Sequence, residues 1–261
     1  MLGKISKITA IALAAAVGSA ATAQDLQVGA NIGNVPWEFQ DDTGANVGFE
    51  VDLVNAVAEK LGRGVEIVNI PFQGLFSAVQ SGRVDIAMSS ITITDERLAS
   101  VTFAQPYYDS DQSLTVAAGG PASMDEMSGK VVGVDTGSTG DMWATEHQAE
   151  YGITTINRYE GLAPAMLDLA AGRINGYISD IPALQYYVKD KPELKVVQRI
   201  ATGEAYSMMF AKDAALATEV NDVLTTLKQD GTIAGLHEKW FGAVPEDTTS
   251  TVTVMDMPTL N

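Results

Sequence analysis

Short apolar runs alternate with stretches of helical periodicity along most of the chain. Apolar residues at every third or fourth position predict helices, and compact apolar runs bounded by turn residues predict strands. The predicted strands are 26–30, 65–70, 84–88, 130–134, 154–159 and 174–178. The predicted helices are 51–61, 75–80, 162–171, 219–227 and one that follows residue 232. This alternation indicates an α/β fold with mostly parallel strands.

One unit of the chain has a second, similar copy. Residues 77–90 and 167–180 each run from a helix through Gly-Arg into a short apolar strand that ends in polar residues. A glycine after a helix is also a common helix cap, so the pattern alone leaves two interpretations open. If two lobes are built alike, each presents polar groups at the carboxyl end of a strand. Open α/β sheets bind ligands at that edge, and two facing edges would form a cleft.

The first 23 residues have the features of an export signal. Lys4 and Lys7 precede the apolar run 8–17, and Ala21-Thr-Ala23 is an A-x-A cleavage pattern. The run is shorter than the roughly 20 apolar residues of a membrane span. We therefore expect cleavage after Ala23 and a periplasmic mature protein.

Charge and composition exclude several classes of function. The chain has a formal net charge of -17 and no cysteine. An acidic surface argues against nucleic-acid binding, which needs clustered Lys and Arg. Without cysteine there is no disulfide, thiol chemistry or lipid attachment through cysteine. The two histidines are far apart in the sequence, which makes a zinc site improbable. We expect a monomer without metal or cofactor.

Hydroxyl groups and an arginine follow one of the predicted strands. Ser89, Ser90 and Thr92 come directly after strand 84–88, and Arg97 follows shortly after them. Hydroxyls, backbone N–H groups and a guanidinium can bind a carboxylate through charge-assisted hydrogen bonds. The alternative is that Thr94 caps a helix with Arg97 on its solvated face. Both interpretations can hold at once.

The residues around this segment resemble a known family. Ile91-Thr-Ile-Thr-Asp-Glu-Arg97 and Phe103-Ala-Gln-Pro-Tyr-Tyr108 are similar to motifs of the periplasmic polar amino-acid-binding proteins of ABC importers, the glutamine and histidine binders in particular. The similarity continues through Gly48-Phe-Glu-Val-Asp-Leu53, Gly133-Val-Asp-Thr-Gly-Ser-Thr139 and Lys239-Trp-Phe-Gly242. It therefore spans nearly the whole mature chain in the right order.

The resemblance implies a type II periplasmic-binding-protein fold of two lobes, each a mixed sheet flanked by helices. Lobe 1 would contain 24–111 and 207–243, and lobe 2 would contain 112–206. The chain would cross between the lobes twice, near Asp111 and near Tyr206, and these crossings would act as hinges. A free amino acid would bind in the cleft and be passed to a membrane permease. The tail, 244–261, is either a loose end or a latch strand.

The resemblance also implies which residues bind the ligand backbone. Arg97 would hold the α-carboxylate together with Ser90 and Thr92. The turn Gly137-Ser138-Thr139 would add hydroxyl and backbone donors from lobe 2, with Thr139 as the main contributor. Asp180 would accept hydrogen bonds from the α-ammonium. A zwitterion taken out of water needs one partner of each charge, so these roles are chemically consistent.

The residues expected around the ligand side chain depart from the family pattern. Asn31 stands where the family usually has an acidic residue, and Asn34 stands where an aromatic residue usually faces the one at Phe72. Asp135 replaces a lysine of the glutamine-binding relatives. Trp37 fits the core better than the ligand pocket. A neutral polar amino acid is therefore our first expectation, and a cationic one, paired with Asp135 or another acid, is the second.

One alternative function belongs to a different class. The same scaffold resembles periplasmic cyclohexadienyl dehydratase, which eliminates water and carbon dioxide from prephenate or arogenate. Such chemistry needs a positioned acid, for which Asp135 or Glu160 could be nominated. Neither lies in a recognisable catalytic motif, so a binding protein without enzyme activity is the main expectation.

Overall fold

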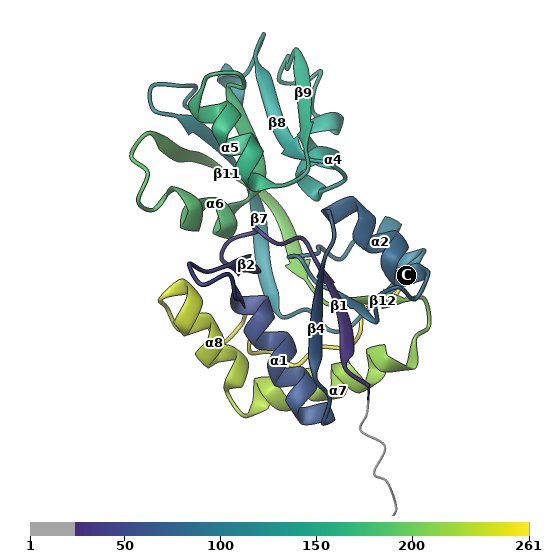
Figure 1. The fold of residues 1–261 in the computed structure, drawn as a ribbon. Helices are drawn as coiled ribbons and strands as arrows, with labels where there is room; N and C mark the ends of the chain where they lie inside the picture. Colours follow the sequence, from purple (N-terminus) through teal and green to yellow (C-terminus); the bar gives the residue numbers. More distant parts are fainter. Residues whose placement is uncertain (1–23, 261) are drawn as a thin grey trace, which may run out of the picture.

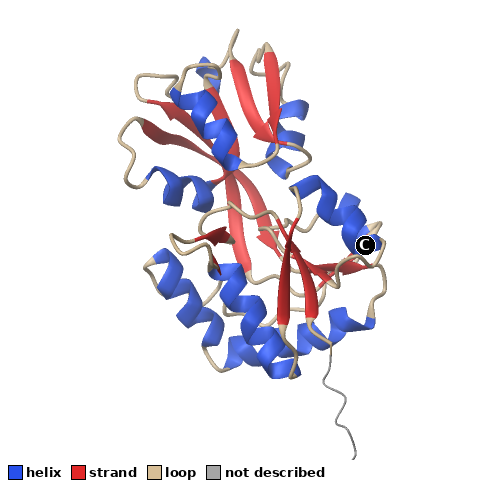
Figure 2. Ribbon diagram, in the orientation of Figure 1, coloured by secondary structure: helices blue, strands red, loops and turns tan. Residues whose placement is uncertain are grey.

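The computed structural model describes residues 24–260, and the expected export signal of residues 1–23 lies outside them. The described chain forms two five-stranded mixed sheets with helices packed on them, one sheet above the other (Figures 1 and 2). We call the part built on the first sheet lobe 1 and the part built on the second sheet lobe 2. Within residues 24–260, no helix is both long enough and apolar enough to span a membrane.

Lobe 1 is built on a sheet with strand order β4-β1-β5-β12-β6. β1 pairs in parallel with β4 and β5, whereas β12 runs antiparallel to β5 and β6. The strands are β1 (Leu26–Ala30), β4 (Val65–Asn69), β5 (Ile86–Ala87), β6 (Val101–Phe103) and β12 (Met209–Ala211). A separate two-stranded sheet is the hairpin of β2 (Phe39–Gln40) and β3 (Asn46–Val47). The helices are α1 (Phe49–Leu61), α2 (Phe72–Gln80), α3 (Asp95–Leu98), α7 (Ala215–Gln229) and α8 (Thr232–Phe241).

Lobe 2 is built on a sheet with strand order β11-β7-β10-β8-β9. β8 pairs in parallel with β9 and β10, whereas β7 runs antiparallel to β10 and β11. The strands are β7 (Tyr108–Ala117), β8 (Val131–Asp135), β9 (Thr155–Tyr159), β10 (Gly176–Asp180) and β11 (Leu194–Tyr206). The helices are α4 (Thr139–Glu146), α5 (Leu162–Ala170), α6 (Ile181–Val188) and the short 3-10 turn η1 (Met124–Glu126).

Two long antiparallel strands connect the lobes. β7 and β11 extend from lobe 1 into lobe 2 (Figure 1), and the register of their pairing shifts between Ile200 and Glu204. Asp111 lies in β7 and Tyr206 ends β11, so both expected crossing points fall on these strands. We therefore keep the proposed extents of the lobes. Lobe 1 contains residues 24–111 and 207–243, and lobe 2 contains residues 112–206.

Trp37 occupies the centre of the lobe 1 core. Its side chain is fully buried and makes edge contacts with the rings of Phe49, Tyr108 and Tyr206, with ring centroids 5.6, 4.7 and 5.3 Å away. Edge-to-face packing of this kind adds to the burial of apolar area. The assignment of Trp37 to the core is confirmed, and its use as a ligand-contacting aromatic is wrong.

Each sheet is mixed, and the expectation of mostly parallel strands is confirmed, because four of the five strands in each sheet run in the same direction and one, β12 or β7, runs opposite to them. The pattern along the sequence did not predict β6, β7, β11 and β12. In β7 the reason is visible in the burial pattern. Ser110, Asp111, Gln112 and Ser113 are all buried, so polar residues occupy inward positions where an apolar signal is normally read.

The two similar units of the sequence adopt the same local structure. Gly82 and Gly172 follow α2 and α5 with the same left-handed φ of 71°. The next residue in each copy closes the helix with a backbone hydrogen bond of 2.9 Å, from Arg83 to Ala78 and from Arg173 to Asp168. Both interpretations of the pattern therefore hold, since each glycine caps a helix and each unit ends in polar residues at the lobe junction.

The C-terminal tail is bound to lobe 1 and forms neither a strand nor a loose end. The Lys228 ammonium is buried and donates to the carbonyl oxygens of Pro106 and Thr253, at 2.7 and 2.8 Å. Ser250 N donates to Asp109 Oδ2, which lies at the start of β7. Burial lowers the pKa of Lys228 to about 8. The tail thus completes the hydrogen bonding of a buried cation.

Removing residues 244–261 is expected to lower the melting temperature by about 4–8 °C. The truncation takes away one of the two carbonyl acceptors of the Lys228 ammonium. A lost hydrogen bond to a buried charge costs about 2 kcal/mol, and each kcal/mol moves the transition by roughly 2–4 °C in a protein of this size. Removal of residues 259–261 alone is the control and should change the melting temperature by less than about 1 °C. Equal melting of both truncations and the full chain would contradict this assignment.

Candidate functional site

Every candidate ligand-binding residue identified in the sequence lines one cavity at the junction of the lobes. These residues are Asn31, Asn34, Phe72, Ser89, Ser90, Thr92, Arg97, Ser138, Thr139 and Asp180. Asp135, expected near the ligand side chain, also lines the cavity, and the structure adds Ser179. The cavity measures about 30 Å³, little more than a water molecule needs. A larger groove of about 680 Å³ between α6 and α8 contains none of the candidate residues.

Two buried carboxyl groups hold the corner at the end of β5. Ser90 has a φ of 45°, in the left-handed region that non-glycine residues rarely adopt. Its backbone N–H donates to Glu50 Oε1 at 2.9 Å, and the Ser89 hydroxyl donates to Glu38 Oε1 at 2.5 Å. Burial raises the pKa of Glu38 well above its usual range, and the neighbouring Glu50 adds to the effect. These bonds fix a strained corner that directs both serines toward the cavity.

Arg97 reaches across the junction from lobe 1 to lobe 2. Its guanidinium donates to the carbonyl oxygen of Thr92 at 2.7 Å and to that of Gly137, in lobe 2, at 3.2 Å. The group lies 5.5 Å from the centre of the Phe72 ring. Only 4% of Arg97 is exposed, and burial lowers its pKa to about 10, so the side chain remains a cation at neutral pH. Within residues 24–260, it is a buried positive charge without a carboxylate within 4 Å.

The alternative interpretation of Arg97 is half correct. Thr94 caps α3, since its hydroxyl oxygen accepts a hydrogen bond of 3.2 Å from Arg97 N. The Arg97 side chain does not lie on a solvated face, as the capping interpretation implied, because it is buried in the junction. The cap instead fixes the backbone from which the guanidinium extends.

Asp180 approaches the cavity from lobe 2. Its carboxylate accepts hydrogen bonds from Gln112 Nε2 at 2.7 Å and from the Ser90 hydroxyl of lobe 1 at 3.3 Å. Desolvation raises its pKa to about 8, and the nearby negative charge of Glu204 acts in the same direction. Asp180 precedes α6 but makes no side-chain cap bond to that helix. Its carboxylate is therefore available to the cavity, in an environment that disfavours its charge.

A second layer of polar residues lies beside the cavity and was not identified from the sequence. Glu204 accepts hydrogen bonds from the hydroxyls of Thr92 and Thr139, and Gln112 donates to both Glu204 and Asp180. Glu204 is buried on the same face of β11 as Ile200 and Tyr206, but it gave no signal in the sequence, because that strand was not predicted. Glu50 did give a signal, since an acid interrupts the apolar face of α1.

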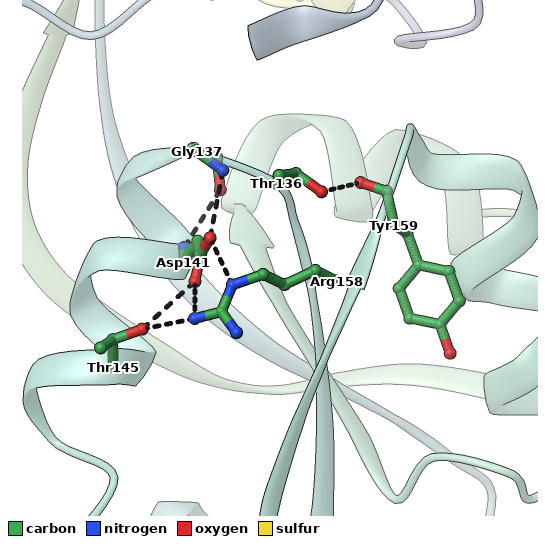
Figure 3. A network of polar contacts seen from close by, with 7 residues as sticks. Thr136, Gly137, Asp141, Thr145, Arg158 and Tyr159 are labelled. Atoms are coloured by element: carbon green, nitrogen blue, oxygen red, sulfur yellow. Dashed lines mark hydrogen bonds and ion pairs between the residues drawn. The ribbon is translucent and has the colours of Figure 1, made fainter.

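An ion pair fixes the turn that carries Ser138 and Thr139 (Figure 3). Asp141 accepts a hydrogen bond from Gly137 N at 3.1 Å, and its own N–H donates to the Ser138 hydroxyl at 3.1 Å. Arg158 of β9 binds both oxygens of Asp141, at 2.9 and 2.8 Å. The bidentate pair holds the start of α4 against the sheet of lobe 2.

A second cavity of about 90 Å³ adjoins the first and is acidic. It shares Asn31, Asn34 and Asp135 with the first cavity and adds Glu160. Asp135 accepts a hydrogen bond of 3.0 Å from Gly161 N, and desolvation raises its pKa to about 6. Among the described residues that line the two cavities, Arg97 is the one cation. The combined site therefore offers one guanidinium and three carboxyl groups, those of Asp135, Glu160 and Asp180.

Comparisons with known proteins agree on one family. A family model described as bacterial extracellular solute-binding proteins, family 3, matches residues 26–243. The putative ABC transporter arginine-binding protein 2 of Escherichia coli (strain K12) is 31% identical over 229 residues, which cover 85% of this chain and 93% of that protein. An ancestral arginine-binding protein bound to arginine matches with a TM-score of 0.80 and 33% identity, covering 85% of this chain and 100% of that one. An ancestral amino acid-binding protein described as a precursor of cyclohexadienyl dehydratase matches with a TM-score of 0.77 and 34% identity, covering 83% and 95%.

Replacing Asp180 by Asn is expected to raise the melting temperature measured without an added amino acid. The carboxyl has a pKa of about 8 in the folded protein and about 3.9 in an unfolded chain, so the folded state binds the extra proton between these values. Stability therefore falls as pH rises from about 4 toward 8. Asparagine keeps the shape and cannot ionise, so the two pKa values imply a gain of about 5 kcal/mol at pH 8, or roughly 10–20 °C.

The same comparison at different pH values identifies the cause. The gain should shrink toward zero near pH 3, below the pKa of the unfolded chain, where both states hold the proton. Asp190→Asn, at an exposed position, is the matched control and should change the melting temperature by less than about 1 °C. Thermal melts followed by circular dichroism give the melting temperatures of the wild type and of both variants. If Asp180→Asn is no more stable than the wild type at pH 8, burial of the Asp180 charge does not destabilise the protein.

Proposed function

The chain belongs to the bacterial extracellular solute-binding proteins of family 3, and we propose that it captures a free amino acid in the periplasm and delivers it to the permease of an ABC importer. One observation carries the proposal. A guanidinium from lobe 1 and a carboxylate from lobe 2 line the same buried cavity, as the two ends of a zwitterion require.

The backbone of an amino acid matches these groups. Arg97 would bind the α-carboxylate, and the hydroxyls of Ser90, Thr92 and Thr139 lie around the same cavity. Asp180 would accept the α-ammonium. A bound ammonium favours the charged form of Asp180 and so lowers its pKa from about 8. Each ligand charge would thus stabilise a protein charge that burial alone disfavours.

Binding of this kind requires movement of the lobes. A cavity of about 30 Å³ does not admit an amino acid, so the lobes have to separate along β7 and β11 before the ligand enters. The ligand favours closure only to the extent that it binds the closed form more tightly. Contacts to Arg97 on one lobe and Asp180 on the other supply that difference.

The ligand side chain we propose is cationic, such as that of arginine. After Arg97 and Asp180 have bound the ligand backbone, Asp135 and Glu160 remain as charges in the adjoining cavity. A cation there would pair with Asp135, whose pKa of about 6 leaves it mostly ionised at neutral pH. The neutral polar side chain favoured by the sequence stays a prediction, and the acidic lining of the second cavity favours the cationic one over it.

Catalysis is the less favoured function. Asp135 has the raised pKa that a general acid needs, and the likeness to a precursor of cyclohexadienyl dehydratase is the observation in favour of an enzyme. The same carboxylate is accounted for by pairing with a cationic ligand. We therefore expect no phenylpyruvate when the protein is incubated with prephenate.

Thermal-shift measurements with single amino acids test the proposal. L-arginine at about 100 times its dissociation constant should stabilise the protein by about 2.7 kcal/mol, or roughly 5–10 °C. L-glutamine should give a smaller shift. Asp135→Asn should weaken arginine binding about tenfold or more and leave glutamine binding within about threefold, because it removes one charge pair.

The control is Asp42→Asn, at an exposed position outside both cavities, which should leave both affinities unchanged. Calorimetric titration gives the affinities. No shift with any amino acid at millimolar concentration would refute amino-acid capture. A larger shift with glutamine than with arginine would refute the cationic side chain and support the neutral one.

A further inference from the structure

Glu204 is a buried acid on one of the two strands that connect the lobes. It lies on β11 directly after the register shift that follows Ile200, opposite Ser110 of β7. Only 8% of the residue is exposed. Glu204 does not line the cavity, but it contacts two residues that do. The proposed binding of an amino acid gives it no role.

One oxygen of Glu204 joins the two lobes. Glu204 Oε2 accepts a hydrogen bond of 2.7 Å from the Thr92 hydroxyl and one of 2.9 Å from the Thr139 hydroxyl. Thr92 follows β5 in lobe 1, and Thr139 begins α4 in lobe 2. The two hydroxyl oxygens lie 3.3 Å apart. Because the threonines belong to different lobes, both bonds exist only while the lobes are together.

The other oxygen of Glu204 is bound to the connecting strands. Oε1 accepts hydrogen bonds from Gln112 Nε2 at 2.9 Å and from the Thr202 hydroxyl at 3.0 Å. A carboxylate has about four acceptor positions, and these contacts occupy all of them. Within the described chain, no Lys or Arg nitrogen forms an ion pair with Glu204. The buried carboxyl group therefore depends on these hydrogen bonds, and separation of the lobes removes the one from Thr92, which is the bond that crosses between them.

We propose that Glu204 is a latch that holds the lobes together in the absence of an amino acid. The latch makes a closed population available before binding, and a ligand that binds the closed form then has less of the conformational change left to drive. Glu204 acts through Thr92 and Thr139, so it is a positioning residue and not a ligand contact. Its effect on interlobe distance is independent of the proposed function, and its effect on affinity rests on that function.

The distance between the lobes measures the latch directly. The chain has no cysteine, so Glu59→Cys on α1 and Glu146→Cys at the end of α4, both exposed, give a unique pair of labelling sites for fluorescence energy transfer. Without an amino acid, Glu204→Ala should increase the interlobe distance. L-arginine should restore the wild-type distance, with a midpoint about 10 to 100 times higher. The higher midpoint should come from faster dissociation of L-arginine. A general loss of folding would not change the dissociation rate in this way.

Two further variants keep the test decisive. Glu193→Ala, an exposed acid just before β11, is the matched control and should leave distance and affinity unchanged. Glu204→Gln retains one acceptor oxygen and should shift the distance in the same direction by less, so it decides the matter if the alanine variant does not fold. Equal distances in the wild type and in both Glu204 variants would overturn the latch. A distance change with no response of any variant to any amino acid, L-arginine included, would leave the latch standing and refute the proposed function.

Discussion

A buried guanidinium without a carboxylate partner is the feature on which the rest of the site depends. Arg97 is held by carbonyl oxygens from both lobes, and among the described residues no carboxylate, Glu204 and Asp180 included, forms an ion pair with it. Burying the positive charge of a guanidinium in this way is unfavourable unless an anion pairs with it. The α-carboxylate of an amino acid would supply that anion, and the α-ammonium of the same ligand would pair with Asp180. The same two charges thus explain both the chemistry of the ligand and why it should draw the lobes together.

The scaffold presents these charges through repeated local structure and buried supports. In each lobe a helix, a left-handed glycine and a short strand bring polar residues to the junction. Glu38 and Glu50 fix the serine corner of lobe 1, and the Asp141–Arg158 pair fixes the turn of lobe 2. Groups held this firmly lose little freedom on binding, which favours a tight and specific site. The lobe movement that we propose would be concentrated in β7 and β11.

The sequence predicted the site better than the sheets. Side chains at the ends of strands follow a strong apolar signal, so the positions of Ser89, Ser90 and Asp180 at the junction could be predicted from the sequence, and all three line the cavity. The connecting strands could not be found, because buried polar residues such as Gln112 and Glu204 erase the alternation that identifies a strand. Their partners lie far along the chain, and one partner of Glu204, Thr92, lies on the other lobe, so their role becomes visible only in the folded structure.

A calorimetric thermodynamic cycle tests most directly whether Arg97 binds the ligand carboxylate. L-arginine and L-argininamide, which lacks the carboxylate charge, are titrated into the wild type and into Arg97→Ala. Each single change should weaken binding by about 30-fold or more, the range for removing one partner of a buried charge pair. The two changes together should cost little more than the larger one alone, since they remove the same interaction. Losses that simply multiply, or a single change that leaves affinity within about threefold, would contradict the account.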